Sequence, residues 1–216
     1  MTSLPNAKSC EERLTTIISD TPKLHCWDGE WCDGGLTNHM LRELFGITRW
    51  FKTSGGAIVL ETGAGLSTLV FLAAEPRKLI TIEPDPELIG RIKTEIARLS
   101  LCGPDHQFYT DCSENILPEL VKDEVPYLDV ALIDGGHGMP TVFVDFCYMN
   151  KALKQGGYLA VDDIQLHSAR QLYLLLKQQP GFEISANLGK LIVFKKTADI
   201  RFLPDFLNQP FVRNNS

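Results

Sequence analysis

The sequence lacks several features that mark membrane, extracellular or nucleic-acid-binding proteins. No uninterrupted apolar run reaches the roughly 18 residues that a membrane-spanning helix needs. Positive charge is not in excess, because 27 acidic residues outnumber 21 lysines and arginines, which argues against a nucleic-acid substrate. The six cysteines include no C-x-x-C pair, a usage that suits a reducing compartment. We therefore expect a cytoplasmic protein that acts on a small molecule, with no membrane or nucleic-acid partner.

The composition is that of an ordinary globular domain. With 216 residues, 44% of them hydrophobic and 22% charged, the chain is long enough to bury a full core. We expect a single domain over residues 1–216, with a helical N-terminal extension (1–50), a core (58–196) and a C-terminal tail (197–216). Aromatic residues in the extension and the tail can line a pocket or a subunit interface, so a homo-oligomer is left open.

From residue 58 onward, apolar runs of strand length alternate with amphipathic segments, as in a parallel sheet covered by helices on both faces. The expected strands are 58–61, 79–83, 107–110, 128–134, 158–162, 182–185 and 191–194. The expected helices are 10–18, 38–50, 67–74, 86–101, 112–121, 139–153 and 166–179. Only residues 186–190 join the last two strands, which is too short for a parallel crossover and predicts an antiparallel hairpin. The predicted fold class is α/β, a Rossmann-like three-layer sandwich with a seven-stranded, mostly parallel sheet and an antiparallel last strand.

A glycine-containing turn follows the first of these strands, in the run Ile58-Val-Leu-Glu-Thr-Gly-Ala-Gly-Leu-Ser-Thr68. Gly63 and Gly65 allow the backbone to turn tightly and to approach a ligand at the carboxyl ends of the strands. The next strand ends at Glu83, and an acid about 20 residues after such a turn can bind ribose hydroxyls. This pattern predicts a nucleoside cofactor.

Two cofactors use this geometry, and the flanking residues distinguish them. A dinucleotide site has a third small residue where Thr68 stands, and a carboxylate at Glu61 would repel its pyrophosphate. S-adenosylmethionine instead carries an ammonium and a sulfonium, which Glu61 would attract. The run resembles the E-x-G-x-G-x-S-T signature of class I S-adenosylmethionine-dependent methyltransferases. This resemblance implies S-adenosylmethionine as cofactor and the binding residues Glu61, Gly63, Gly65, Ser67 and Glu83.

Two later strands also end in acids, at Asp134 and at the pair Asp162-Asp163. If these strands are neighbours, about 4.8 Å apart, three carboxylates converge at one edge of the sheet. Like charges raise each other's pKa, so a hard divalent cation, magnesium first, is the expected ligand. Two alternatives stay open: Asp163 can cap the following helix, and Asp134 can lie near the cationic end of the cofactor without metal.

The segment Asp134-Gly-Gly-His137 adds a histidine, whose ordinary pKa of about 6.5 suits proton transfer near neutral pH. We expect His137 to be a general base. D-G-G-H followed by G-G-Y-L-A-V-D-D resembles the small-molecule O-methyltransferases of the macrocin and cephalosporin-tailoring type. That resemblance implies magnesium held by Asp134, Asp162 and Asp163, with Asp134 and His137 as catalytic residues. Catechol O-methyltransferase is more distantly similar, but it has asparagine where Asp163 stands.

The third strand leads into a segment, 108–117, that resembles the G-D-[AS]-x-E-x-L adenine-binding stretch of the same methyltransferases. The resemblance implies that Asp111 and Cys112 contact the adenine, although Thr110 replaces the glycine. The alternative is that Asp111 caps the following helix, with Glu114 completing a capping box.

The function predicted from the sequence is metal-assisted O-methylation of a small molecule. A metal-independent methyltransferase is the nearest alternative. A nicotinamide-dependent oxidoreductase would need the third glycine and a Tyr-x-x-x-Lys pair, neither of which is present. A binding module that holds the cofactor without catalysis is also compatible with the fold. The N-terminal extension can cover the site or pack against the edge of the sheet.

Overall fold

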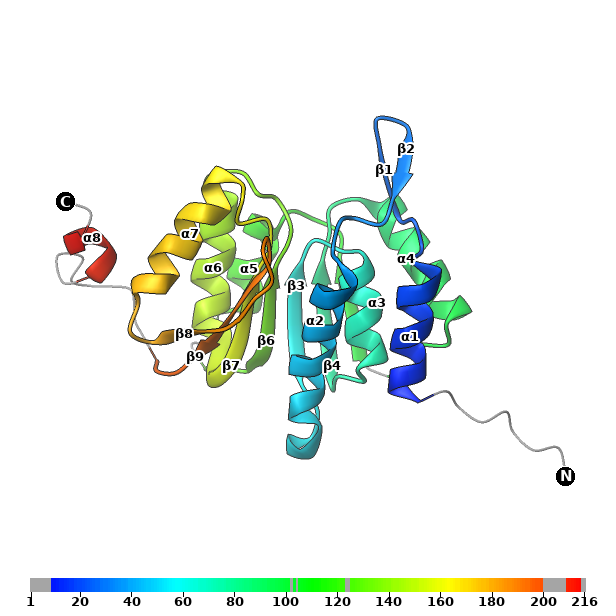
Figure 1. Cartoon of the computed structure of the whole chain (residues 1–216), viewed down its shortest axis with the longest axis horizontal. Helices are drawn as coiled ribbons and strands as arrows, with labels where there is room; N and C mark the ends of the chain where they lie inside the picture. Colours follow the sequence, from blue (N-terminus) through cyan, green and yellow to red (C-terminus); the bar gives the residue numbers. More distant parts are fainter. Residues whose placement is uncertain (1–8, 102, 104, 123–124, 200–208, 215–216) are drawn as a thin grey trace, which may run out of the picture.

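The computed structural model describes residues 9–101, 103, 105–122, 125–199 and 209–214, and a seven-stranded sheet lies at its centre (Figure 1). The strand order is β5-β4-β3-β6-β7-β9-β8. The strands are β3 (Ile58–Thr62), β4 (Lys78–Ile82), β5 (Asp105–Tyr109), β6 (Leu128–Ile133), β7 (Leu153–Val161), β8 (Phe182–Asn187) and β9 (Ile192–Lys196). The pairs from β5 to β7 are parallel, whereas β9 is antiparallel to both β7 and β8. The predicted fold class and the reversed last strand are confirmed.

Helices cover both faces of the sheet (Figure 1). One face carries α1 (Cys10–Asp20), α2 (Asn38–Trp50), α3 (Leu66–Ala73) and α4 (Pro86–Arg98); the other carries α5 (Ser113–Leu120), α6 (Thr141–Ala152) and α7 (His167–Gln178). A short 3-10 helix, η1 (Phe51–Ser54), follows α2. In the tail, α8 (Pro210–Asn214) packs on α7. None of the described helices is long and apolar enough to cross a membrane.

Local sequence signals set where the helices begin. The hydroxyl of Thr37 accepts a hydrogen bond from the backbone N–H of Met40 and so caps α2. Asp85 caps α4 by accepting from the N–H of Glu87, and Pro86 occupies the first helical position, where its missing N–H costs nothing. These caps explain why helix starts read from the sequence agree with the structure within one or two residues.

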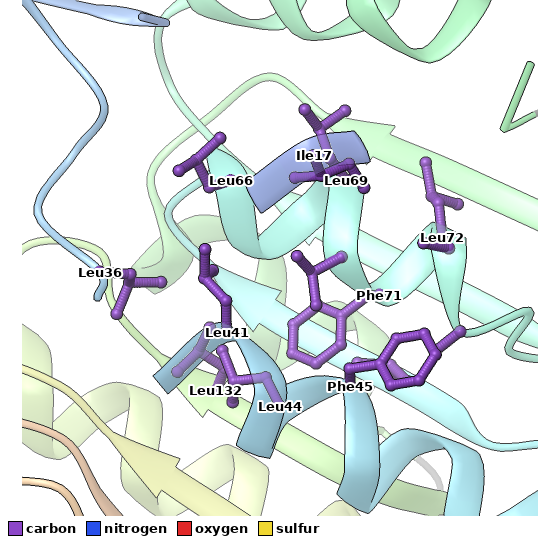
Figure 2. Close-up of a cluster of buried hydrophobic side chains, with 14 of the residues drawn as sticks. Ile17, Leu36, Leu41, Leu44, Phe45, Leu66, Leu69, Phe71, Leu72 and Leu132 are labelled. Carbon is purple, nitrogen blue, oxygen red and sulfur yellow. The ribbon is translucent and has the colours of Figure 1, made fainter. Parts of the chain in front are cut away.

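The N-terminal extension is part of the main core. Ile17 of α1 and Leu44 of α2 belong to the same buried cluster as Phe71 of α3 and Leu132 of β6, and all are almost fully buried (Figure 2). Each such side chain contributes about 1.5–3 kcal/mol by leaving water. Of the two placements left open, the structure therefore rules out simple packing on the sheet edge: α1 and α2 cover a face of the sheet.

Two segments differ from the prediction. Residues 25–32, expected as a loop, form a hairpin of β1 (His25–Trp27) and β2 (Glu30–Cys32). Its turn is Asp28-Gly29, with φ of 51° and 84°, the two-residue sequence that favours such hairpins. In addition, β7 begins at Leu153, five residues before the expected strand 158–162, and Gly156-Gly157 lie inside it, beside a register shift in its pairing with β6.

The strand tips are hydrogen-bonded one residue beyond the regular ladders. The N–H of Asp134 donates to the carbonyl of Thr62 over 3.1 Å, and the N–H of Asp162 donates to that of Ile133 over 3.0 Å. Gly63 closes this edge with a φ of +80°, and a Cβ there would overlap the carbonyl oxygen of Asp134. Only glycine tolerates both this positive φ and such a close approach of the Asp134 backbone.

We predict that Gly63→Ala lowers the free energy of unfolding by about 2–4 kcal/mol, through strain and overlap together. Urea unfolding without added ligand measures the change. Gly90→Ala in α4 is the matched control, because nothing lies within 4 Å of its added Cβ and the helix should gain up to about 1 kcal/mol. Equal stability of the two variants would contradict the assigned role of Gly63.

Candidate active site

The glycine loop rests on a fully buried carboxylate. Glu61 is 0% exposed, and its oxygens accept hydrogen bonds from Ser67 Oγ at 2.7 Å, Thr68 Oγ1 at 2.6 Å and Thr81 Oγ1 at 2.8 Å. The N–H of Gly65 donates to Thr68 Oγ1, which ties the loop to the same group. Burial raises the pKa of Glu61 to about 7, although the three hydroxyl donors oppose the shift.

This arrangement corrects two expectations from the sequence. Glu61 lies behind the loop with its hydrogen bonds made inside the protein, so it braces the loop and does not face a cationic ligand. Ser67 is 2% exposed and its hydroxyl is committed to Glu61, so it also supports the loop from behind. The sequence motif is present as predicted, but these two side chains serve the fold of the loop.

Glu83, by contrast, lies at the rim of the loop. Its carboxylate accepts from the N–H of Asp85 at 2.8 Å and from the N–H of Ala64 within the glycine loop. Burial raises its pKa, and the two backbone donors partly offset that. The N–H of Glu83 also donates to the carbonyl of Tyr109, so the tip of β5 lies beside it. The acid and the loop are therefore next to each other, as the nucleoside pattern requires.

Asp111 and Cys112 follow the tip of β5 and are exposed. The backbone cap of α5 is Cys112, and Asp111 accepts from the N–H of Cys112 and from Asn115 Nδ2, which lowers the pKa of Asp111. Glu114 is not part of a capping box, since it accepts from Thr141 Oγ1. The alternative of a capping box at Asp111 is therefore wrong, and both predicted adenine contacts are open to a ligand.

Asp134 and Asp162 end the neighbouring strands β6 and β7, as predicted. Burial, followed by the negative charge of Asp162, raises the pKa of Asp134 well above its usual range. Asp162 is 1% exposed, and its Oδ1 has no hydrogen-bond partner among the described residues. The two acids thus lie close together, and their like charges disfavour ionisation of Asp134.

Lys190, in the turn between β8 and β9, neutralises the remaining charge. Its Nζ donates to Asp162 Oδ2 at 2.6 Å and to Asp163 Oδ1 at 2.9 Å. Burial opposes the lysine charge, but the two carboxylates outweigh it and raise the pKa of Lys190. Burial also acts against the charge of Asp163, whose pKa is nevertheless lowered by hydrogen bonds from Lys190 and Gln165. The ammonium is therefore a fixed positive charge of the site.

Sequence reasoning missed Lys190, although a signal for it existed. An antiparallel β9 begins at the edge where β7 ends, so residues just before β9 must lie beside Asp162. The N–H of Ile164 donates to the carbonyl of Lys190 and fixes its backbone there. Asp163 adopts a left-handed conformation with φ of 54°, and α7 begins only at His167, so Asp163 is not a helix cap.

The predicted magnesium site does not fit this arrangement. Among the residues with described positions, no three His, Cys, Asp or Glu side chains are placed to hold a metal ion. The ammonium of Lys190 lies between Asp162 and Asp163 and donates to both, so these two carboxylates do not present the free charged oxygens that magnesium prefers. The acids converge as expected, but a lysine balances their charge.

His137 faces this cluster. Its Nε2 lies 3.3 Å from Asp163 Oδ2 and 3.8 Å from Asp134 Oδ1, so a positive imidazolium would be paired with carboxylate. Its backbone carbonyl accepts from Ser168 Oγ at the start of α7, which holds the loop against the helix. The predicted acid and base residues are thus brought together in one cluster with Lys190.

The N-terminal hairpin also reaches the site. The ring of His25 lies against both Gly34 and Gly65, where an added Cβ would lie 2.8 Å and 2.9 Å from Nε2. Burial, followed by the charge of Arg91, lowers the pKa of His25. A Cβ at Gly35 would lie 3.8 Å from Lys190 Nζ. The extension therefore passes over the glycine loop and the lysine, and it forms part of the site.

Comparison with known proteins agrees with this geometry. Residues 60–164 match the model of a methyltransferase domain, and no curated protein matches the chain. Similar solved structures include an SAH-bound methyltransferase from Podospora anserina, with 13% identity over 89% of this chain and 91% of that one and a TM-score of 0.63. An O-methyltransferase from Bacillus cereus in complex with SAH shares 15% identity over 90% and 94%, with a TM-score of 0.57. An rRNA methylase from Streptococcus thermophilus shares 16% over 74% and 96%, with a TM-score of 0.55.

The methyltransferase-domain match covers the central part of the chain, just under half of its 216 residues. The domain match spans the glycine loop, Glu83 and the cluster from Asp134 to Asp163. The solved structures, at identities of 13–16%, establish the shared fold. They include proteins described as acting on different acceptors, so the acceptor has to be argued from the residues of this site.

The raised pKa of Glu61 predicts that stability falls as pH rises. Because the folded protein favours the protonated acid, the Glu61 contribution is present at low pH and is lost between about pH 4.5 and 7. Relative to the wild type, Glu61→Gln should therefore gain about 2 kcal/mol in free energy of unfolding between pH 5 and pH 8. Urea titrations at both pH values measure this difference.

Asp145, whose pKa burial raises to about 6, changes wild-type stability in the same direction. Comparing Glu61→Gln with wild type cancels that contribution, because both proteins retain Asp145. A difference between the two proteins that is the same at both pH values would show that Glu61 is ionised in the folded state throughout.

Proposed function

We propose that this protein is an S-adenosylmethionine-dependent O-methyltransferase of a small hydroxylated acceptor. The observation that carries the proposal is the placement of His137 at 3.3 Å from Asp163, beside the tips of β6 and β7, on the same sheet edge as the glycine loop and Glu83. A cofactor-binding edge and a proton-accepting cluster therefore adjoin one another. The acidic net charge of −6 favours a small molecule over RNA as acceptor.

The cofactor is bound by the backbone of the glycine loop and by acids at the strand tips. Gly63 and Gly65 keep the loop free of side chains, and Glu83 is placed to accept hydrogen bonds from ribose hydroxyls. Asp111 and Cys112, exposed after β5, are proposed to flank the adenine. Asp134 lies where the loop meets β6 and is proposed to face the methionine end.

His137 supplies the proton transfer. When bound, S-adenosylmethionine provides a methyl group whose bond to sulfur breaks as its bond to the acceptor oxygen forms. His137 takes the acceptor's hydroxyl proton at Nε2, and Asp163 pairs with the resulting imidazolium. The rest of the site holds the two reactants in line, which removes much of the entropic cost of their encounter.

Of the alternatives, the metal-independent enzyme is favoured by the place of Lys190 between Asp162 and Asp163. A dehydrogenase is disfavoured by the absence of the third glycine and of a Tyr-x-x-x-Lys pair. A cytoplasmic location remains a prediction from the sequence.

We predict that Glu83→Ala weakens binding of S-adenosylhomocysteine by about 10-fold or more, as expected when a charged hydrogen-bond acceptor is lost. Isothermal titration calorimetry measures the change. Glu87→Ala, an exposed acid in the first turn of α4, is the matched control and should bind as the wild type does. NADH should give no heat of binding. Tight NADH binding, or unchanged affinity in Glu83→Ala, would reject the assigned cofactor site.

We predict that His137→Ala lowers kcat by about 100-fold to 10,000-fold while S-adenosylhomocysteine binds normally, because a general base is lost and the cofactor site is not. A hydroxylated acceptor found by screening with radiolabelled methyl donor provides the assay. His167→Ala, an exposed histidine at the start of α7, is the control and should keep full activity. If His137→Ala also keeps full turnover, another group must take the proton.

A further inference from the structure

Lys190 holds the position that a divalent cation was expected to hold. Its Nζ donates to Asp162 and Asp163 at 2.6 Å and 2.9 Å, and its side chain remains 23% exposed. An ammonium has three N–H donors, so these two contacts leave one. The backbone of Lys190 is held by the hydrogen bond from Ile164, and its ammonium is held by the two carboxylates.

The base and the ammonium share one carboxylate. His137 Nε2 is 3.3 Å from Asp163 Oδ2, and Lys190 Nζ is 2.9 Å from Asp163 Oδ1. Asp163 is held between them in a left-handed conformation, a backbone strain that such sites often contain. An acceptor oxygen that contacts both groups can therefore lose its proton to one while it is held by the other.

We propose that Lys190 binds the acceptor oxygen through its third N–H and stabilises the negative charge that forms there, in place of a divalent metal. This inference rests on the proposed methyltransferase function. Lys190 stays protonated throughout: the acceptor's proton goes to His137, and the oxygen then bonds to the methyl carbon as the carbon–sulfur bond breaks. The backbone of Gly35 borders the space beside the ammonium.

The replacement of a metal by an ammonium also selects the class of acceptor. A divalent ion can chelate two neighbouring oxygens and favours vicinal diols such as catechols, whereas an ammonium needs only one oxygen. One positive charge stabilises an oxyanion less than two, so the acceptor hydroxyl has to be acidic already. A phenol, with a pKa near that of tyrosine at about 10, meets this condition, while an aliphatic alcohol does not. The structure therefore assigns a phenol or enol with a single reacting hydroxyl.

The test uses 4-nitrophenol as a probe of the acceptor site and needs no turnover. With the full chain saturated in S-adenosylhomocysteine, we expect bound 4-nitrophenol to titrate at a pH at least one unit below that of the free compound, as seen in its absorption spectrum. In Lys190→Met this shift should disappear. Lys154→Met is the matched control, because it removes a lysine that is also ion-paired to an aspartate, Asp129, but at the opposite ends of β6 and β7, and it should retain the shift.

Binding of manganese, followed by electron paramagnetic resonance, gives an independent readout. Wild-type protein should not bind Mn²⁺ with a Kd below about 1 mM, whereas Lys190→Met frees Asp162 and Asp163 and should bind it more tightly than wild type. Mn²⁺ bound tightly by wild type and released by Asp162→Asn would overturn the proposal, as would a 4-nitrophenol shift that survives in Lys190→Met.

Binding of S-adenosylhomocysteine distinguishes a failure of the Lys190 proposal from a failure of the methyltransferase assignment. If it binds to wild type and to Lys190→Met but no 4-nitrophenol shift appears in wild type, the role of Lys190 is wrong and the methyltransferase assignment stands. If it binds to neither, the proposed function itself fails. Retained binding in Lys190→Met also shows that the variant is folded.

Discussion

The site depends on how negative charge is balanced where β6 and β7 end. Asp134, Asp162 and Asp163 meet there because parallel strands end at one edge of the sheet, and three ionised carboxylates in that space would repel one another strongly. The ammonium of Lys190 relieves this repulsion at Asp162 and Asp163, and the pKa of Asp134 is raised. The turn between β8 and β9 is therefore tied to the tip of β7, and His137 has carboxylates to face.

A second buried acid supports the cofactor side in a different way. Glu61 of β3 accepts hydrogen bonds from two hydroxyls of α3 and one of β4, so it joins these three elements under the glycine turn. Gly63 completes the turn by lying against the backbone of Asp134, which links the cofactor loop to the catalytic cluster. The two halves of the site are thus held at a fixed separation by backbone contacts, as preorganised catalysis requires.

Much of this could be predicted from the sequence, for reasons that particular residues make clear. Apolar runs such as 58–61 and 128–134 mark buried strands, and Asp85-Pro86 marks a helix start, because these signals act over a few residues. The convergence of Asp134 and Asp162 followed from strand adjacency. The hairpin at 25–32 and the early start of β7 were missed, because Asp28-Gly29 and Gly156-Gly157 each fit more than one local structure.

By itself, the sequence determined the α/β fold, the reversed last strand, the glycine loop and the acids at the strand tips, because hydrophobic period and turn residues are local properties of the chain. Only the tertiary structure decided the direction of Glu61, the raised pKa of Asp134 and the partner of Asp162. Those outcomes depend on burial and on Lys190, 27 residues beyond Asp163 along the chain but 2.9 Å away in space. A motif places an acid at a strand tip, but the surrounding fold decides which charge it meets.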